Sequence, residues 1–337
     1  MTTVAPAPTR RQSQRCESAA RREPVPARIE TPGSYTADGT SLTKLASSVD
    51  PGAWSPDRRL FAFKVAIDER LVEICAVDVS AGRVVSAGNE LQAGAPYAPG
   101  ATQLWSDTGR LMMNHWGTEV DLVEVDPETG GRTKVAEGGM FDVSPDGRRL
   151  VTPSGSADDP SLSIVDLHRR ATRAVMLPRR PSPPTAPRWI TADKVAYHSR
   201  GLFTLDLSTG EHAAVVEEAD NAAIGTFAFS RDGLAVAWSL TGATASADHG
   251  LYIRRAAGPV TKIASPANPL AWSADATALL TTSCDDRSCR LDVIDFNNQQ
   301  SALIAQTSTN ELRFLSRSGW TPDGVIEFGV MAFPMAR

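Results

Sequence analysis

Val143-Ser144-Pro145-Asp146-Gly147 is the clearest copy of a short phrase that occurs seven times in this chain of 337 residues. In each copy a large apolar residue comes first and an aspartate follows within four positions. The first positions are 38 residues apart at the closest, from Trp105 to Val143, and 51 at the farthest, from Trp54 to Trp105. The seven copies begin at Trp54, Trp105, Val143, Trp189, Phe229, Trp272 and Trp320.

The phrase combines strand chemistry with turn chemistry. Aromatic and β-branched residues favour strands. In the residues that follow, proline presets φ, aspartate can bond the backbone two residues on, and glycine supplies φ > 0. Each copy is therefore predicted to end one strand and open a hairpin into the next. A unit of about 40–50 residues with several strands is typical of a β-propeller blade, so the sequence predicts an all-β, seven-bladed β-propeller.

A second pattern recurs at a fixed place in the unit. An alternating strand ends in aspartate before a turn, at Asp78, Asp126, Asp166, Asp206 and Asp295. The fifth unit departs from the pattern, because Arg254-Arg255 stand where the aspartate would fall. A residue that recurs in every blade is expected to stabilise a turn, so these aspartates are predicted to be structural, as is the repeated tryptophan that packs between sheets.

The two ends of the chain complete each other. Residues 42–47 match residues 260–265, and both segments shortly precede a copy of the phrase. The last copy, at Trp320, has only 17 residues after it. We therefore expect the N-terminal strand to join the C-terminal strands in one sheet, which closes the ring and removes exposed sheet edges. Tyr35 to Asp38 can add a second N-terminal strand, so the split is three-plus-one or two-plus-two.

The phrase resembles the TolB-like, PD40-type (WD40-like) propeller repeat, and it is also similar to repeats in the propellers of prolyl-oligopeptidase-type peptidases. The resemblance covers residues 40–337 and implies the propeller fold. TolB proper carries an extra N-terminal α/β domain and fewer blades, and this chain has no room for that domain. The peptidases carry a hydrolase domain, whose G-x-S-x-G motif does not occur here.

Residues 1–33 differ in composition from the rest of the chain. They are rich in Pro, Ala, Arg and Ser and have almost no large apolar residues, so we predict a disordered tail. Arg10-Arg11 and Arg21-Arg22 lack the apolar stretch that an export signal needs after the pair, and Cys16 lacks the context of a lipoprotein cysteine. A tethering arm for an acidic partner is the alternative. Residues 34–337 are predicted to form a single β-propeller domain.

Composition narrows the range of partners. The formal net charge is −5, which is unlike the strong basic excess of nucleic-acid-binding surfaces. No apolar run approaches the roughly 18 residues that a membrane-spanning helix needs. The chain is therefore expected neither to bind nucleic acid nor to span a membrane. We also expect it to be a monomer.

Propeller geometry places the loops between second and third strands, together with the inter-blade loops, on one face. The resemblance to other propellers implies that this face binds the ligand. A Pro-rich inter-blade loop over residues 178–187 belongs to it. The predicted binding rim consists of Arg70, His115, Trp116, Asp158, Asp159, Arg179, Arg180, Arg200, His249, Asp285, Asp286 and Arg287.

Three of the five histidines fall on this rim. A metal or acid–base site built from His115, His198 and His249 with a carboxylate is the catalytic hypothesis. The alternative is that they are solvated loop residues, because no local spacing such as H-x-x-x-H ties them together. We therefore assign no catalytic residue, no metal and no cofactor, and keep these three as candidates.

One pair of cysteines is informative. Cys284 and Cys289 bracket a predicted four-residue hairpin loop, where facing residues come close enough for a disulfide. A disulfide there would point to an oxidising, extracytoplasmic compartment, whereas the absence of a visible export signal points to the cytoplasm. A reduced pair or half of a metal site remains open. Cys75 alternates with Val77 and is expected to be a plain core residue.

The sequence supports three classes of function. The first is a non-catalytic binding module whose loop face recognises a protein, peptide or glycan. The second is a lyase or hydrolase that acts at the channel mouth through a histidine and carboxylate set. The third is a scaffold that its rim holds in a larger complex.

Overall fold

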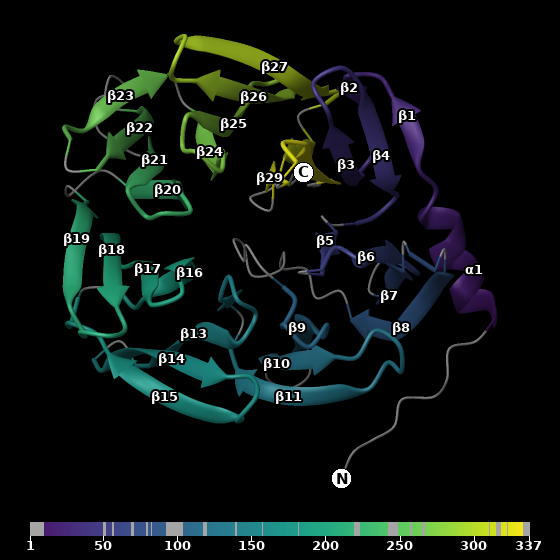
Figure 1. The fold of residues 1–337 in the computed structure, drawn as a ribbon, viewed down its shortest axis with the longest axis horizontal. Coiled ribbons are helices and arrows are strands. Elements are labelled where there is room, and N and C mark those ends of the chain that lie inside the picture. Colours follow the sequence, from purple (N-terminus) through teal and green to yellow (C-terminus); the bar gives the residue numbers. More distant parts are fainter. Residues whose placement is uncertain are drawn as a thin grey trace. The chain divides into compact units, whose positions relative to one another are not determined.

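The computed structural model describes most of the chain. The described residues are 10–49, 52–55, 57–68, 71–78, 80–81, 83–91, 104–116, 120–138, 140–156, 158–180, 182–218, 223–241, 249–256, 258–264, 267–309, 311–314, 318–321 and 323–332. The fold is an all-β, seven-bladed β-propeller, as the repeat predicted, built from seven sheets in which β2 and β27 form a parallel pair and the other pairs that we describe are antiparallel (Figure 1). No helix in the described residues is long and apolar enough to cross a membrane.

The chain forms two compact units. The first takes Met1–Arg21, Ala46–Ser199 and Leu205–Gly210, and the second takes Arg22–Leu45, Arg200–Thr204 and Glu211–Arg337. Whether residues 34–337 behave as one domain, as the sequence suggested, stays a prediction.

Three sheets lie in the first unit. Their hydrogen-bonded strand orders are β5-β6-β7-β8, β9-β10-β11 and β12-β13-β14-β15. The strands are β5 (Ala53–Trp54), β6 (Leu60–Ala66), β7 (Leu71–Asp78), β8 (Arg83–Leu91), β9 (Leu111–Trp116), β10 (Val120–Val125), β11 (Arg132–Glu137), β12 (Asp142–Val143), β13 (Arg149–Gly155), β14 (Pro160–Asp166) and β15 (Ala171–Met176).

A fourth sheet has the order β16-β17-β18-β19, and the boundary between the units runs through it. Its strands are β16 (Thr185–Thr191), β17 (Lys194–His198), β18 (Gly201–Asp206) and β19 (His212–Glu217). Strand β16 begins inside the Pro-rich segment, which is therefore partly strand.

The second unit holds the remaining three sheets. Two have the orders β20-β21-β22-β23 and β2-β27-β26-β25-β24, and the third has the order β1-β4-β3-β30-β28 with β29 beside β30. The strands from the C-terminal half are β20 (Ala223–Phe229), β21 (Ala235–Thr241), β22 (Gly250–Arg255), β23 (Thr261–Ala264), β24 (Asn268–Trp272), β25 (Ala278–Cys284), β26 (Cys289–Asp295), β27 (Gln300–Thr307), β28 (Leu312–Phe314), β29 (Gly319–Trp320) and β30 (Ile326–Ala332).

The last sheet contains strands from the N-terminal and the C-terminal parts of the chain, as predicted. Strand β3 (Gly33–Ala37) pairs antiparallel with β30, and β4 (Leu42–Ala46) lies on the other side of β3. Tyr35 stacks on Phe328, with ring centroids 5.6 Å apart, in the core of this sheet. The split is two-plus-two when β28 and β29, which both pair with β30, are counted as one strand: these and β30 come from one end, and β3 and β4 come from the other.

Residues 10–33 form regular structure, which corrects the disorder predicted for residues 1–33; residues 1–9 lie outside the described residues. Helix α1 (Arg10–Ala19) packs on β7 and β8 of the first unit. In the second unit, β1 (Glu23–Val25) pairs with β4, and β2 (Arg28–Ile29) pairs in parallel with β27 (Figure 1). This segment therefore covers the outer strand of two sheets and the outer part of a third.

The amino-acid composition did not predict this order, because a disulfide and backbone hydrogen bonds hold the segment in place. Cys16 forms a disulfide with Cys75 of β7, so Cys75 is not the plain core residue that the sequence predicted. Cys16 and Ala19 are the small apolar side chains that α1 buries. Strands β1 and β2 gain hydrogen bonds from exposed sheet edges, which require no apolar side chains.

The turn after the phrase has one hydrogen-bond pattern in five of the seven copies. In the first sheet, the Ser55 hydroxyl donates to Asp57 Oδ1 (2.6 Å) and accepts the backbone N–H of Leu60 (2.9 Å). The same serine–aspartate bond recurs at the turns of β12–β13, β20–β21 and β24–β25, and a threonine–aspartate bond takes its place before β30. The phrase aspartates therefore stabilise turns. The strand-end aspartates also accept backbone N–H groups of their turns, as predicted, at Asp78, Asp126, Asp166, Asp206 and Asp295.

These bonds make the fold sensitive to acid. The Ser273 hydroxyl, and then the Thr277 backbone N–H, hold the pKa of Asp275 below its usual value of 3.8. Because the folded-state pKa is lowered, the stabilisation is present above about pH 4 and is lost as the pH falls toward the folded value. We expect Asp275→Asn to reduce the loss of thermal stability between about pH 6 and pH 3, measured by circular dichroism. Asp158→Asn, in an exposed turn, is the control; an equal effect there would contradict the prediction.

Three of the five phrase tryptophans tie neighbouring sheets together. The indole N–H of Trp105 donates to the Ala53 carbonyl of β5 (3.0 Å), and that of Trp189 donates to the Asp142 carbonyl of β12 (3.2 Å). In the second unit, Trp272 donates in the same way to Ala228 of β20 (3.0 Å). The tryptophans therefore pack between sheets, and each also satisfies a backbone carbonyl of the preceding sheet.

The arginines that break the aspartate pattern also bridge sheets. Arg254 donates to the Val215 carbonyl of β19 (3.0 Å). Arg255 donates to the Ala276 carbonyl (2.6 Å) and lies over the ring of Phe296, 4.5 Å from its centroid. The fifth sheet thus replaces a turn aspartate with bonds to its neighbours.

Candidate functional site

The structure describes most of the predicted rim. Asp158 and Asp159 are exposed in the β13–β14 turn, Arg200 is exposed in the β17–β18 turn, and Asp285, Asp286 and Arg287 are exposed in the β25–β26 turn. These turns all join a second strand to a third strand. Arg70 lies outside the described residues, as do the side chains of His115 and Trp116, whose backbone belongs to β9.

The other rim residues flank the sheets. Arg179 is exposed and Arg180 is half-buried between β15 and β16, and half-buried His249 directly precedes β22. Burial raises the pKa of Tyr197 in β17, and the Arg180 guanidinium opposes this shift. The Arg180 Nε atom is buried, so this side chain does not point only into solvent.

The three candidate histidines stand in different surroundings. His198 Nδ1 is 3.3 Å from the Thr185 hydroxyl at the start of β16. His249 belongs to the second unit, whereas His115 and His198 belong to the first. Among the residues that the structure describes, no group of three or more His, Cys, Asp or Glu side chains is placed to hold a metal ion. A site made from these histidines stays a prediction.

Among the rim turns that the structure describes, the β25–β26 hairpin is the one closed by a disulfide. Cys284 and Cys289 face each other in the ladder and form a disulfide. Inside it, Asp285 Oδ1 accepts the backbone N–H groups of Arg287 (2.7 Å) and Ser288 (2.8 Å). These two bonds lower the pKa of Asp285. The loop therefore has a fixed backbone, and it presents Asp286 and Arg287 to solvent.

Further contacts anchor the base of the hairpin. The backbone N–H of Cys289 donates to the Thr307 hydroxyl of β27 (2.7 Å), and the Gln306 amide donates to the Ser288 hydroxyl (2.7 Å). Arg313 of β28 donates from Nη1 to the Cys289 sulfur (2.9 Å). Sequence reasoning missed Arg313, because it is 24 residues from Cys289 and belongs to a strand of another sheet.

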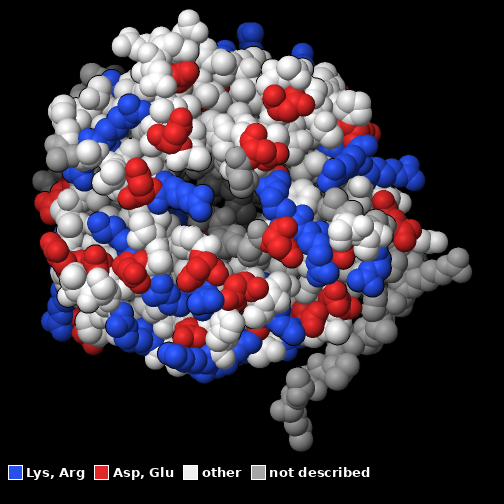
Figure 2. All heavy atoms as spheres, in the orientation of Figure 1, with Lys and Arg blue, Asp and Glu red and all other residues white. Residues whose placement is uncertain are grey.

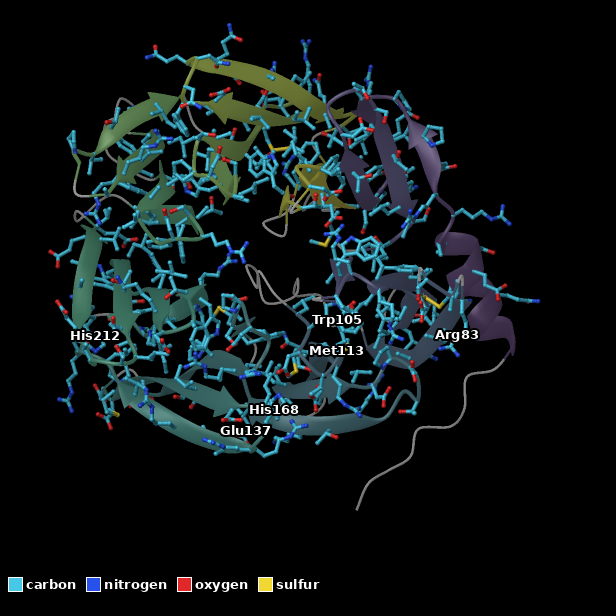
Figure 3. The ribbon with its side chains drawn as sticks, viewed as in Figure 1. Arg83, Trp105, Met113, Glu137, His168 and His212 are labelled. Carbon is cyan, nitrogen blue, oxygen red and sulfur yellow. A yellow bond between two sulfur atoms is a disulfide. The ribbon has the colours of Figure 1, made fainter. Side chains whose placement is uncertain are left out.

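A polar cluster at the opposite strand ends was also missed. Asp107 receives the Arg148 Nε–H at Oδ2 (3.2 Å), and its Oδ1 is 2.7 Å from His168 Nε2 (His168 is labelled in Figure 3). Asp107 occupies the place that proline takes in the Trp54 and Val143 copies, which is the signal that could have indicated it. The close approach also needs Gly147 (φ 72°), since a Cβ there would lie 2.4 Å from the Asp107 nitrogen. The cluster links two sheets and supplies no base next to a nucleophile.

Charge does not single out one part of the face that Figure 2 shows. On the face drawn in Figure 2, acidic and basic residues of the described chain are interspersed. This mixture agrees with the small net charge of −5. Recognition at the face drawn in Figure 2 would therefore depend on individual side chains and loop shape more than on a strong electrostatic field.

Comparison with known proteins supports the fold. No family model matches the chain, and no curated protein sequence matches it significantly. The oligogalacturonate lyase from Vibrio parahaemolyticus is similar over 90% of this chain and 98% of its own, with 14% identity and a TM-score of 0.59. A structure of prolyl endopeptidases matches over 93% of this chain and 55% of its own, with 12% identity and a TM-score of 0.60.

A protein from Agrobacterium tumefaciens assigned as TolB matches over 79% of this chain and 99% of its own, with 15% identity and a TM-score of 0.51. At these identities the likeness extends to the fold alone. The resemblance to TolB-like repeats is thus supported at the level of the propeller. The chain is similar to propellers that differ widely in function, so function has to be argued from the site.

Proposed function

We propose that the protein is a non-catalytic binding module that recognises a protein, peptide or glycan through the loops between second and third strands. The observation that carries the proposal is the β25–β26 hairpin, where a disulfide and two side-chain bonds fix the backbone behind Asp286 and Arg287. A loop held in one conformation loses little entropy on binding, so rigid loops favour recognition.

The cysteines support a compartment for this function. The chain has four cysteines, and all four are joined in disulfides. Disulfides persist in oxidising environments and are rare in the cytosol. We therefore place the protein in an extracytoplasmic compartment, in preference to the cytoplasm.

The ligand class is tested by presenting the labelled full-length protein to a peptide library and a glycan array. We expect one class to bind, and Asp286→Ala combined with Arg287→Ala to weaken that binding at least about tenfold. This pair removes one charge of each sign, so the net charge is unchanged. Affinity is measured by titration calorimetry with the best ligand from the screen.

The matched control removes one acid and one base at the opposite strand ends of the same unit. Glu211 and Arg231 are exposed there, in the β18–β19 and β20–β21 turns. Glu211→Ala combined with Arg231→Ala should leave binding unchanged. If the control pair weakens binding and the hairpin pair does not, the proposed face is wrong.

The enzyme alternative predicted from the sequence is decided on the same glycan and peptide panel. Release of a product from a panel member is measured by chromatography. If the wild-type protein releases product and His198→Ala or His249→Ala does not, the protein is an enzyme and the non-catalytic module is wrong. Binding without product release supports the module.

A further inference from the structure

The two disulfides of this protein lie in different surroundings. Cys16 and Cys75 are both fully buried, with exposed fractions of 0%. Cys284 is exposed at the end of β25, whereas its partner Cys289 is fully buried. Only the second disulfide therefore includes an exposed cysteine, which is the side from which a dissolved thiol can approach.

The buried sulfur of that pair has a cationic neighbour. Arg313 Nη1 lies 2.9 Å from the Cys289 sulfur, and Arg313 is half-buried in β28. A hydrogen bond from a guanidinium strengthens when its acceptor becomes an anion. A positive group beside a cysteine stabilises the thiolate, and a stabilised thiolate is the better leaving group in disulfide exchange.

We propose that Cys284–Cys289 is an exchangeable disulfide whose reactant is a thiol, with Arg313 as the group that stabilises the departing sulfur. The thiolate of the reactant attacks the Cys284 sulfur and forms a mixed disulfide. The bond between the two cysteine sulfurs breaks, and its electron pair goes to Cys289 as a thiolate beside Arg313. A second thiolate then attacks the reactant's sulfur in the mixed disulfide, which releases the reactant as its own disulfide and leaves Cys284 reduced.

This activity goes beyond the proposed ligand recognition and does not depend on it, because its reactants are thiols and disulfides alone. The same steps run in reverse when the reduced pair meets an oxidised thiol. In that direction two electrons pass from the protein to the reactant disulfide, so both directions balance.

The first test compares the two disulfides within the wild-type protein. Full-length oxidised protein is incubated with reduced glutathione near neutral pH, quenched, alkylated and digested, and each cysteine is followed by mass spectrometry. We expect Cys284–Cys289 to open at least about tenfold faster than Cys16–Cys75 while the protein stays folded. Equal rates would overturn the proposal, and this comparison needs no variant.

The second test concerns Arg313. Arg313→Met should slow the opening of Cys284–Cys289 about tenfold, and Arg313→Lys should keep most of the wild-type rate. Arg290→Met is the control, because it removes the same charge from the residue next to Cys289 in the sequence. The Arg290 guanidinium pairs with Asp292 (3.0 Å). If Arg290→Met slows opening as much as Arg313→Met, or if neither does, Arg313 has no specific role.

The third test identifies the attacked sulfur. In Cys289→Ser, the remaining exposed Cys284 should form a mixed disulfide with oxidised glutathione, visible in the intact mass. In Cys284→Ser, the buried Cys289 should not. The opposite pattern would overturn the assignment of Cys284 as the attacked residue.

Discussion

Replacing Trp105 with alanine is expected to lower the free energy of unfolding by about 3–5 kcal/mol. The Trp105 side chain is fully buried in the core of the first unit and touches two sheets (labelled in Figure 3). Its removal leaves a cavity and also deprives the Ala53 carbonyl of its indole donor. Urea unfolding, followed by far-ultraviolet circular dichroism, measures the change.

Two further variants separate the causes. Trp105→Phe keeps most of the buried volume and removes the indole N–H, so it should cost about 1–3 kcal/mol. Trp54 is the matched control, because it begins another copy of the same phrase but is half-buried, with the Arg58 guanidinium 4.9 Å from its ring centroid. If Trp54→Ala is as costly as Trp105→Ala, burial between sheets does not explain the role of the repeated tryptophan.

Loss of the Cys16–Cys75 disulfide is expected to have the second large effect. The bond closes a loop between residues 59 positions apart. The chain-entropy relation gives about 4 kcal/mol for a loop of this length. We expect Cys16→Ala combined with Cys75→Ala to lower the free energy of unfolding by about this amount, as measured in urea.

The second disulfide is the internal control, since its cysteines are only five positions apart. The same relation gives about 2 kcal/mol for Cys284→Ala combined with Cys289→Ala. A larger loss for this pair than for Cys16–Cys75 would contradict the loop-length argument.

Helix α1 should also respond locally to the loss of the Cys16–Cys75 disulfide. Arg15 of α1 lies 3.8 Å from the carboxylate of Glu73, which is fully buried in β7. Burial raises the pKa of Glu73, and the guanidinium offsets part of the shift. Without the disulfide, this weak ion pair remains between the helix and β7. Hydrogen exchange of α1 should therefore be faster in the variant that combines Cys16→Ala and Cys75→Ala, under conditions in which the β6–β7 ladder stays closed.

The positions of the rim residues could be predicted from the sequence, because the antiparallel order of the strands in each blade places every second-to-third turn at the same end of its sheet. Residues between second and third strands had to share one end of each sheet, and Asp158, Arg200 and Asp285 occupy such turns. Their role in binding remains a proposal. Arg313 could not be predicted, because a contact over 24 residues between strands of two sheets leaves no periodic trace.

The sequence by itself determined the number of blades, the turn chemistry and the closure of the last sheet. These features could be predicted because they depend on local bonds. Ser55 and Asp57, like their repeats, interact two residues apart, so the spacing is visible in the sequence. Only the tertiary structure decided that residues 10–29 cover outer strands, that Cys16 pairs with Cys75, and that Arg313 meets Cys289. Cysteine spacing does not fix connectivity, and strand addition at a sheet edge uses backbone groups that every residue carries.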